Sequence, residues 1–121
     1  MKIQKYTGLK RVYFALLNSF KGFVWLINNE AAFKQEFIIS AVLILFSFYL
    51  SIDALIQLLL ISVLVFVLVI EILNTAVEVT IDRIGLEHNP LSGLAKDLGS
   101  LAVLLSLFVA LATWSVVLWN I

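Results

Sequence analysis

The chain has 121 residues, of which 63% are hydrophobic and only 13% are charged. An average soluble domain is about 45–50% apolar and roughly 25% charged. A chain this short has too small an interior to bury so much apolar surface, so its composition excludes a soluble enzyme and a disordered chain and predicts an integral membrane protein. Eight Lys and Arg residues balance eight Asp and Glu residues, so no net positive charge favours nucleic acid as a partner. The absence of cysteine excludes disulfide bonds and thiolate metal ligands.

The N-terminal segment, residues 7–27, is amphipathic. Its apolar side chains recur at helical spacing, and its polar side chains fall within about 100° of one another. These polar side chains are Lys10, Arg11, Asn18 and Lys21. The pattern predicts a helix that lies on the membrane surface, with Thr7 as its N-cap.

Three later segments each approach the roughly 20 apolar residues that a membrane helix needs. The expected membrane helices cover residues 31–50, 54–84 and 92–120. The second helix should project beyond the bilayer, because nothing breaks it between its last uncharged residue, Ile70, and Gly85. We therefore expect a single membrane domain over residues 1–121, with three spans and one surface helix.

Turn and charge signals place the last connection and the orientation. Asn89-Pro90 interrupts the chain between the second and third spans, and Ser92 is a candidate cap for the third. Lys and Arg are confined to the N-terminal region and to the loop between these two spans, so the N-terminus is expected in the cytoplasm and the C-terminus outside. The aromatic side chains typical of the outer interface are Tyr49, Trp114 and Trp119.

Acidic and amide side chains at the inner end of the second span are costly in lipid and are therefore candidates for function. They share one stripe of the predicted helix, at Glu71, Asn74, Thr75, Glu78 and Asp82. Polar residues within 28–36 and 96–100 reach the same membrane surface. One interpretation is that these groups join helices through hydrogen bonds and ion pairs. The other is a site for a hard divalent cation, which prefers oxygen ligands.

Three spans are too few to enclose such a stripe, since each helix has only two neighbours. We expect another copy of the chain to cover it, in a trimer or larger homo-oligomer whose sites are composed between subunits. Small residues at Gly99, Ser100 and Ala102 permit a close approach of helices there. The chain has neither a Walker phosphate loop nor a Rossmann glycine motif, so any phosphate would be bound by scattered side chains.

Three blocks of the sequence resemble the small prokaryotic diacylglycerol kinase family. They are EILNTAVEVTIDRIG at 71–85, AKDLGSLAV at 95–103 and NEAAFKQE at 29–36. With GLKRVYFALLNSFKG at 8–22, the resemblance covers nearly the whole chain. It implies ATP-dependent phosphorylation of diacylglycerol to phosphatidate by a homotrimer, with three spans and a surface helix per chain. The implied location is the inner membrane of a Gram-negative bacterium, with the C-terminus in the periplasm.

The resemblance also implies roles for individual residues. Glu71 is the expected general base on the lipid hydroxyl, supported by Asn74. Glu30 and Glu78 are the expected ligands of the Mg²⁺ ion that accompanies ATP. The expected ATP-binding residues are Arg11, Asn18, Glu30, Glu78, Glu87, His88, Asn89, Lys96 and Asp97. The expected lipid-binding residues are Arg11, Glu36, Glu71 and Ser100. The chain departs from the family's pattern at Asn18, where a tyrosine is usual, and in the order of the residues at 87–90.

Three other functions remain open at this point. Related kinases that phosphorylate undecaprenol share the fold, although the blocks at 29–36 and 97–100 resemble the diacylglycerol branch. A small ion- or proton-conducting oligomer would need a polar stripe across the whole bilayer, and residues 54–70 offer only Gln57 and Ser62. A helix-packing or scaffold protein would not require a lysine and several acids at a single level.

Overall fold

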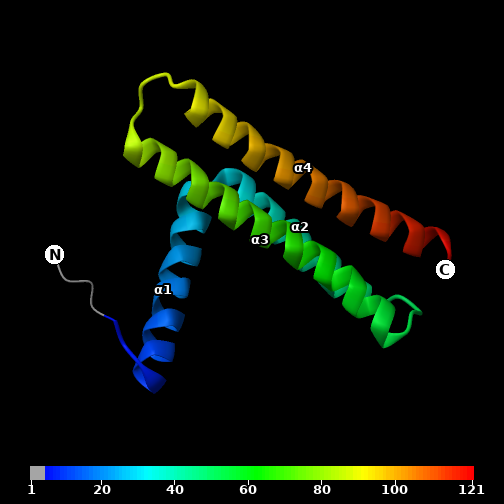
Figure 1. Ribbon diagram of the computed structural model, residues 1–121. Helices are drawn as coiled ribbons and strands as arrows, with labels where there is room; N and C mark the ends of the chain where they lie inside the picture. The colour runs from blue at the N-terminus through cyan, green and yellow to red at the C-terminus, as the bar shows by residue number, and fades with distance from the viewer. Residues whose placement is uncertain (1–4) are drawn as a thin grey trace. The chain divides into compact units, whose positions relative to one another are not determined.

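The computed structural model describes residues 5–121, and over these residues helices joined by short connections are the only secondary structure (Figure 1). Its four helices are α1 (Gly8–Asn29), α2 (Ala31–Ser47), α3 (Ala54–Ile84) and α4 (Pro90–Trp119). The described part therefore contains no strand, which confirms the all-helical prediction. The chain divides into two compact units, the first ending at Gln35 and the second beginning at Glu36.

In the first unit, α1 is a helix over the segment for which the N-terminal pattern predicts one, and its role as an amphipathic surface helix stays a prediction. Many of its large apolar side chains are exposed, among them Leu9, Leu16 and Phe20, whereas Leu26 is buried. At its start the Tyr6 ring stacks on Phe14, with ring centroids 4.4 Å apart, and the Lys10 ammonium lies over the Tyr6 ring. Thr7 occupies the N-cap position with an extended backbone, but its side chain makes no capping hydrogen bond.

Helix α2 begins at the expected residue and is shorter than expected. It ends at Ser47, where residues 48–50 continue as a tight turn with bonds from each N–H to the carbonyl three residues earlier. Its 17 residues leave α3 and α4 as the two described helices that are long and apolar enough to cross a membrane. The structure thus supports a membrane protein with at least two spans, and the third span stays a prediction.

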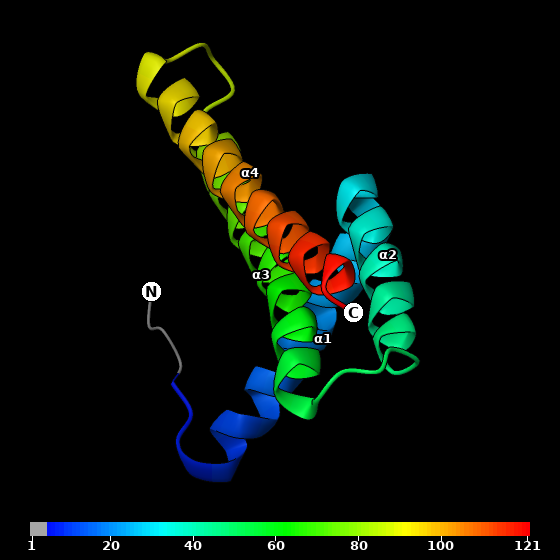
Figure 2. The same ribbon diagram turned by 90° about the vertical axis from the view of Figure 1, so that its right-hand side faces the viewer.

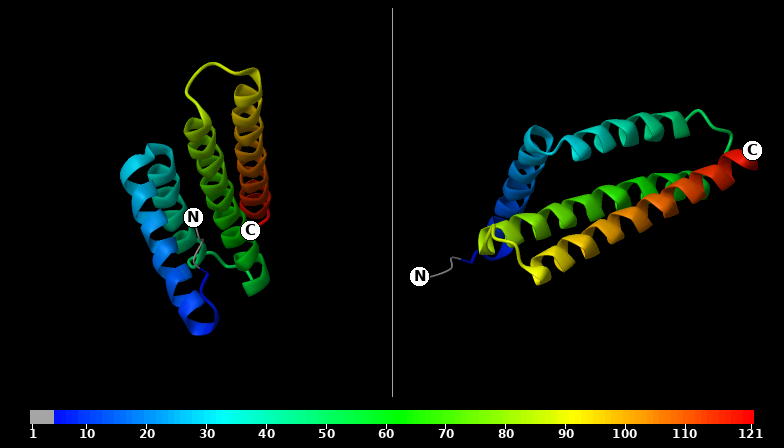
Figure 3. Two further views of the ribbon diagram at one scale, coloured as in Figure 1. Left: turned by 60° about the vertical axis from the view of Figure 1, so that its left-hand side comes forward. Right: turned by 90° about the horizontal axis from the view of Figure 1, so that it is seen from above.

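In the second unit, α3 and α4 form an antiparallel pair that runs side by side over most of its length (Figure 3). Their contact is apolar, centred on Leu60, Leu64 and Val67 of α3 and on Ala110 and Trp114 of α4. The outer surfaces of both helices also carry many exposed apolar side chains. A helix that is apolar all round is stable in lipid, where no aqueous face is needed.

Trp114 is a core residue of the α3–α4 pair, and its place in the outer interfacial belt stays a prediction. Its side chain is 7% exposed, and the indole Nε1–H donates a hydrogen bond to the backbone carbonyl of Leu60 at 3.2 Å. Burial of a tryptophan normally requires such a partner for its N–H group. Trp119, which is 89% exposed, keeps the character of an interfacial residue.

Polar caps fix the ends of the α3–α4 pair. The Asp53 carboxylate accepts from the backbone N–H of Ile56 at 2.9 Å and starts α3, whose residues are those predicted for the second helix. Asn89, and not Ser92, caps α4: its side-chain oxygen accepts from the N–H groups of Leu91 and Ser92. The helix starts two residues earlier than predicted because Pro90 is well suited to the first helical position, where its missing N–H is not needed.

Candidate functional site

The polar stripe of α3 lies on one face of an unbroken helix. Glu71, Asn74 and Glu78 are all half-buried and stand three or four residues apart. The Asn74 side-chain amide donates to Glu78 Oε1 at 3.4 Å. One N–H donor therefore faces the Glu78 carboxylate, whose remaining lone pairs are available to a cation.

Two carboxyl groups meet at the start of the second unit. The Glu36 carboxyl of α2 lies within hydrogen-bonding reach of Glu71 on α3. Glu36 Oε2 is buried and has no hydrogen-bond partner. Two carboxyl groups can share a hydrogen bond only when one of them carries a proton. The structure thus brings Glu36 and Glu71, both predicted to bind the lipid, close to one another.

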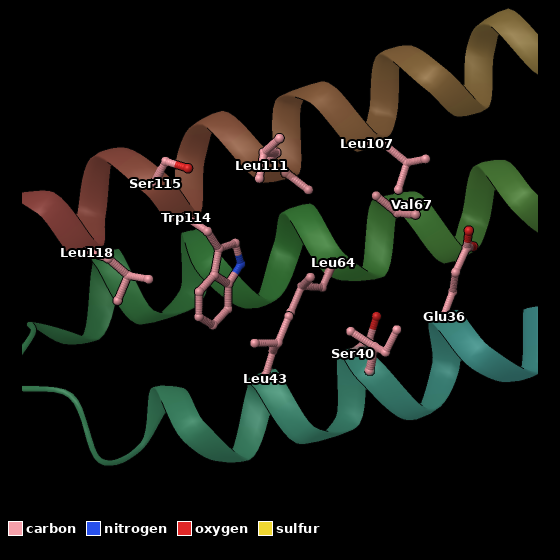
Figure 4. A pocket seen from close by; sticks show the side chains of 12 residues that line it. Glu36, Ser40, Leu43, Leu64, Val67, Leu107, Leu111, Trp114, Ser115 and Leu118 are labelled. Atoms are coloured by element: carbon pink, nitrogen blue, oxygen red, sulfur yellow. The ribbon is translucent and has the colours of Figure 1, made fainter.

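An apolar cavity of about 400 Å³ extends from Glu36 between α2 and the α3–α4 pair (Figure 4). Its walls are mainly alkyl and indole side chains, including Leu43, Leu64, Leu107 and Trp114, with two serines among them. In the close-up the Glu36 carboxyl stands at one end and Trp114 stands farther along the cavity. A cavity with a single acidic end and apolar walls matches a molecule that has one polar group and a hydrocarbon chain.

Lys96 forms an ion pair that the sequence analysis did not anticipate. Its ammonium lies 3.0 Å from Asp82 Oδ1, which joins α4 to α3. The two side chains are 44% and 51% exposed, so the pair contributes no more than about 1 kcal/mol. An anionic phosphate could therefore replace Asp82 as the partner of Lys96 at little cost.

The loop between α3 and α4 borders a second, smaller cavity of about 200 Å³. The side chains around it include Asp82, Glu87, His88, Asn89 and Lys96. The structure thus places the predicted loop residues and the predicted phosphate ligand around one space. Asn89 has its side-chain oxygen committed to capping α4, so only its NH₂ group is free to meet a ligand.

The remaining predicted residues lie on exposed or half-exposed positions. Arg11 and Asn18 are exposed on α1, and Glu30 is half-buried at the C-terminal cap of α1, where its own N–H donates to the Leu26 carbonyl. Asp97 and Ser100 are exposed on α4. Their roles toward ATP, metal and lipid stay predictions.

No group of three or more Asp, Glu or His side chains gathers anywhere in residues 5–121. Mg²⁺ does not require such a cage, since it is usually held by one or two carboxylates together with substrate phosphates and water. The half-buried Glu78 carboxylate, with a single amide donor on one oxygen, fits this mode of binding.

The comparisons with known proteins agree on one family. Residues 17–118 match the family model described as prokaryotic diacylglycerol kinase. The diacylglycerol kinase of Escherichia coli K12 is 44% identical over 116 residues, which cover 94% of this chain and 93% of the relative. The diacylglycerol kinase of Pseudomonas aeruginosa is 42% identical over 112 residues, covering 93% and 91%. That of Haemophilus influenzae is 36% identical over 115 residues, covering 95% and 98%.

The fold and the site define a helical membrane protein with an acidic and amide cluster at one end of an apolar helix pair. With the matches over nearly its full length, the chain belongs to the prokaryotic diacylglycerol kinase family.

Proposed function

We propose that the chain is a lipid kinase that transfers the γ-phosphate of ATP to the hydroxyl group of diacylglycerol, giving phosphatidate. Family membership over residues 17–118 supports the reaction. The observation that carries the site is the position of Glu71, whose carboxyl reaches Glu36 at the end of the apolar cavity. A lipid held by its chains in an apolar groove would present its hydroxyl at this depth.

In the proposed reaction Glu71 acts as the general base. The lipid hydroxyl oxygen forms a bond to the γ-phosphorus, the bond between that phosphorus and the β–γ bridging oxygen breaks, and the hydroxyl proton passes to the Glu71 carboxylate. ADP leaves with the bridging oxygen. Such a transfer depends on in-line positioning and charge neutralisation more than on covalent chemistry. Asn74, three residues from Glu71 on the same face, supports the base and orients Glu78.

The nucleotide is assigned to the cavity beside the α3–α4 loop. Lys96 supplies positive charge for a phosphate, and Asp97 and the loop residues Glu87, His88 and Asn89 border the nucleotide. Arg11, Asn18 and Glu30 contribute from the first unit, and Arg11, Glu36 and Ser100 contact the lipid. Glu30 and Glu78 would hold Mg²⁺, which neutralises phosphate charge when bound.

In the membrane we propose three spans, α2, α3 and α4, with α1 on the cytoplasmic surface of a bacterial inner membrane and the C-terminus in the periplasm. The apolar sequence of α2 and the exposed apolar face of α1 support this arrangement. We further propose a homotrimer with composite sites. Its support is α2, whose backbone makes no close contact with α3 or α4 within the described second unit (Figure 2).

The proposed activity is tested by phosphate transfer from labelled ATP with Mg²⁺, using purified protein in mixed micelles. Diacylglycerol and undecaprenol are offered in parallel. Label in phosphatidate is the expected result. Label in undecaprenyl phosphate alone would keep the mechanism and overturn the acceptor, and a folded oligomer that labels neither lipid would contradict the kinase function.

A further inference from the structure

Gly99 lies where the backbone of α4 comes closest to the polar stripe of α3. A Cβ atom built on Gly99 would collide with Asn74 Oδ1 and would lie 3.1 Å from Asn74 Cγ. The amide of Asn74 therefore fills the space that any other residue at position 99 would need for its side chain. Glycine in helix–helix contacts allows this kind of close approach.

Two glycines in the interior of described helices, Gly22 and Gly93, are in a different situation. A Cβ atom on Gly22 of α1 or on Gly93 of α4 would meet no heavy atom within 4 Å. A glycine in the interior of a helix lowers the stability of the helix by about 1 kcal/mol relative to alanine. Where the surrounding space is open, no close contact offsets this loss. At Gly99 the absence of a side chain leaves room for the side chain of Asn74.

The contact also orients the Asn74 amide. Its Oδ1 is buried and has no N–H or O–H donor, while its Nδ2 donates to Glu78. A hydrogen atom on the Gly99 Cα occupies the direction of the absent Cβ and so points at Oδ1. Weak Cα–H···O contacts of this kind recur at helix–helix interfaces. The amide is thus fixed with its oxygen toward α4 and its donor toward the Glu78 carboxylate.

We propose that Gly99 is a positioning residue of the kinase site, which acts through Asn74 by holding the donor end of its amide on Glu78. The proposal rests on the proposed function for its effect on turnover. The contact itself is a property of the α3–α4 pair.

Replacing Gly99 by alanine forces the amide to move. A rotation away from α4 separates Nδ2 from Glu78. A flip about the Cβ–Cγ bond does not relieve the clash, because Nδ2 then takes the place of Oδ1. The amide must therefore rotate away, Glu78 loses its donor, and its carboxylate is no longer held in one orientation.

The test is a double-mutant cycle of Gly99→Ala with Asn74→Ala, read first as thermal unfolding in detergent without ATP or metal. We expect Gly99→Ala to lower the Tm of the otherwise unchanged protein by several degrees. In the Asn74→Ala background, where the amide is gone, the same substitution should leave the Tm unchanged or raise it. A decrease that is equal in both backgrounds would overturn the proposal, because it would show that Gly99 acts on packing in general.

The second readout is kinetic. We expect Gly99→Ala to lower kcat about tenfold, to raise the Mg²⁺ concentration at half-maximal rate and to leave the KM for diacylglycerol nearly unchanged. Gly22→Ala, on α1 and also in open space, is the control, because Gly93 borders the proposed nucleotide cavity, and it should keep kcat and the Mg²⁺ dependence. Unchanged kcat and Mg²⁺ dependence in folded Gly99→Ala protein would overturn the proposal. If the parent protein phosphorylates no lipid, the proposed kinase function is wrong. The double-mutant unfolding cycle would still show whether Gly99 and Asn74 interact.

Discussion

Glu71 is the residue on which the proposed chemistry depends. Replacing its carboxylate by an amide removes the proton acceptor and keeps the size and the hydrogen-bonding reach of the side chain. We expect Glu71→Gln to abolish phosphate transfer, by at least about a hundredfold, because general base catalysis contributes roughly 10²–10⁴-fold. ATP binding, measured with a fluorescent nucleotide in the same micelles, should be retained.

The matched control is Asp53→Asn, which makes the same chemical change at the N-cap of α3, away from the proposed site. Asn and Asp are equally good N-caps, so the capping bond to Ile56 should survive and activity should be kept. Normal turnover in the Glu71→Gln protein would refute the assignment of the base. Loss of nucleotide binding together with turnover would instead indicate damage to the site as a whole.

Glu78 is predicted to act on the metal and not on the proton. Glu78→Gln keeps a polar side chain beside the Asn74 amide but replaces a carboxylate oxygen that Mg²⁺ prefers. We expect the Mg²⁺ concentration at half-maximal rate to rise about tenfold or more, with part of the rate regained at high Mg²⁺. The measurement is a Mg²⁺ titration at fixed ATP, and a titration identical to that of the parent protein would remove Glu78 from the ligand set.

At the scale of helices, the bond from Trp114 to the Leu60 carbonyl joins α4 to α3 near the end of the pair where α3 begins and α4 ends. Trp114→Phe removes this bond and keeps an aromatic ring. We expect the free energy of unfolding in mixed micelles to fall by about 1 kcal/mol. Trp114→Ala also empties the space of the ring and should cost roughly 3–5 kcal/mol.

Trp119 provides the control for this prediction, because it belongs to the same helix and is almost fully exposed. Trp119→Phe should change the free energy of unfolding by less than about 0.5 kcal/mol. Equal effects at both positions would show that the buried hydrogen bond adds nothing to the stability of the helix pair.

The helices were predictable to different degrees for physical reasons. The residues of α3 follow from an apolar run that no proline or glycine interrupts before Gly85. The end of α2 was missed because the residues after Ser47 are as apolar as the helix itself, and only their tight-turn hydrogen bonds distinguish them. Ser92 and Asn89 are both good caps in sequence, and Pro90 decides between them by starting the helix.

The site divides in the same way. Spacing along one helix placed Glu71, Asn74 and Glu78 on one face without any structure. Contacts between helices could not be predicted from the sequence. Lys96 pairs with Asp82 because α4 runs back along α3, and Glu36 of α2 lies near Glu71 of α3. The close fit of Gly99 against Asn74 appears in the sequence only as a small residue near a polar one.

For the molecule as a whole, the apolar cavity and the wide spacing between the α2 backbone and the α3–α4 pair are the features that support the proposed oligomer. The Arg11, Asn18 and Glu30 side chains belong to one compact unit, and Glu71, Glu78 and Lys96 belong to the other. The proposed homo-oligomer with composite sites would let a neighbouring copy cover the polar face and supply part of each site.

Composite sites make a quantitative prediction for mixed oligomers. Glu30→Gln and Glu78→Gln proteins should each be nearly inactive at low Mg²⁺. When they are unfolded together and reassembled in equal amounts, a site that takes Glu30 from one subunit and Glu78 from the next is intact in about one quarter of cases, whatever the number of subunits in the ring. Phosphate transfer should therefore recover to about one quarter of the parent rate. Mixing Glu71→Gln with Glu78→Gln, both on α3, should restore nothing if one α3 helix serves each site. No recovery in the first mixture would mean that Glu30 and Glu78 act within the same chain or on different sites, and the trimer would then need another justification.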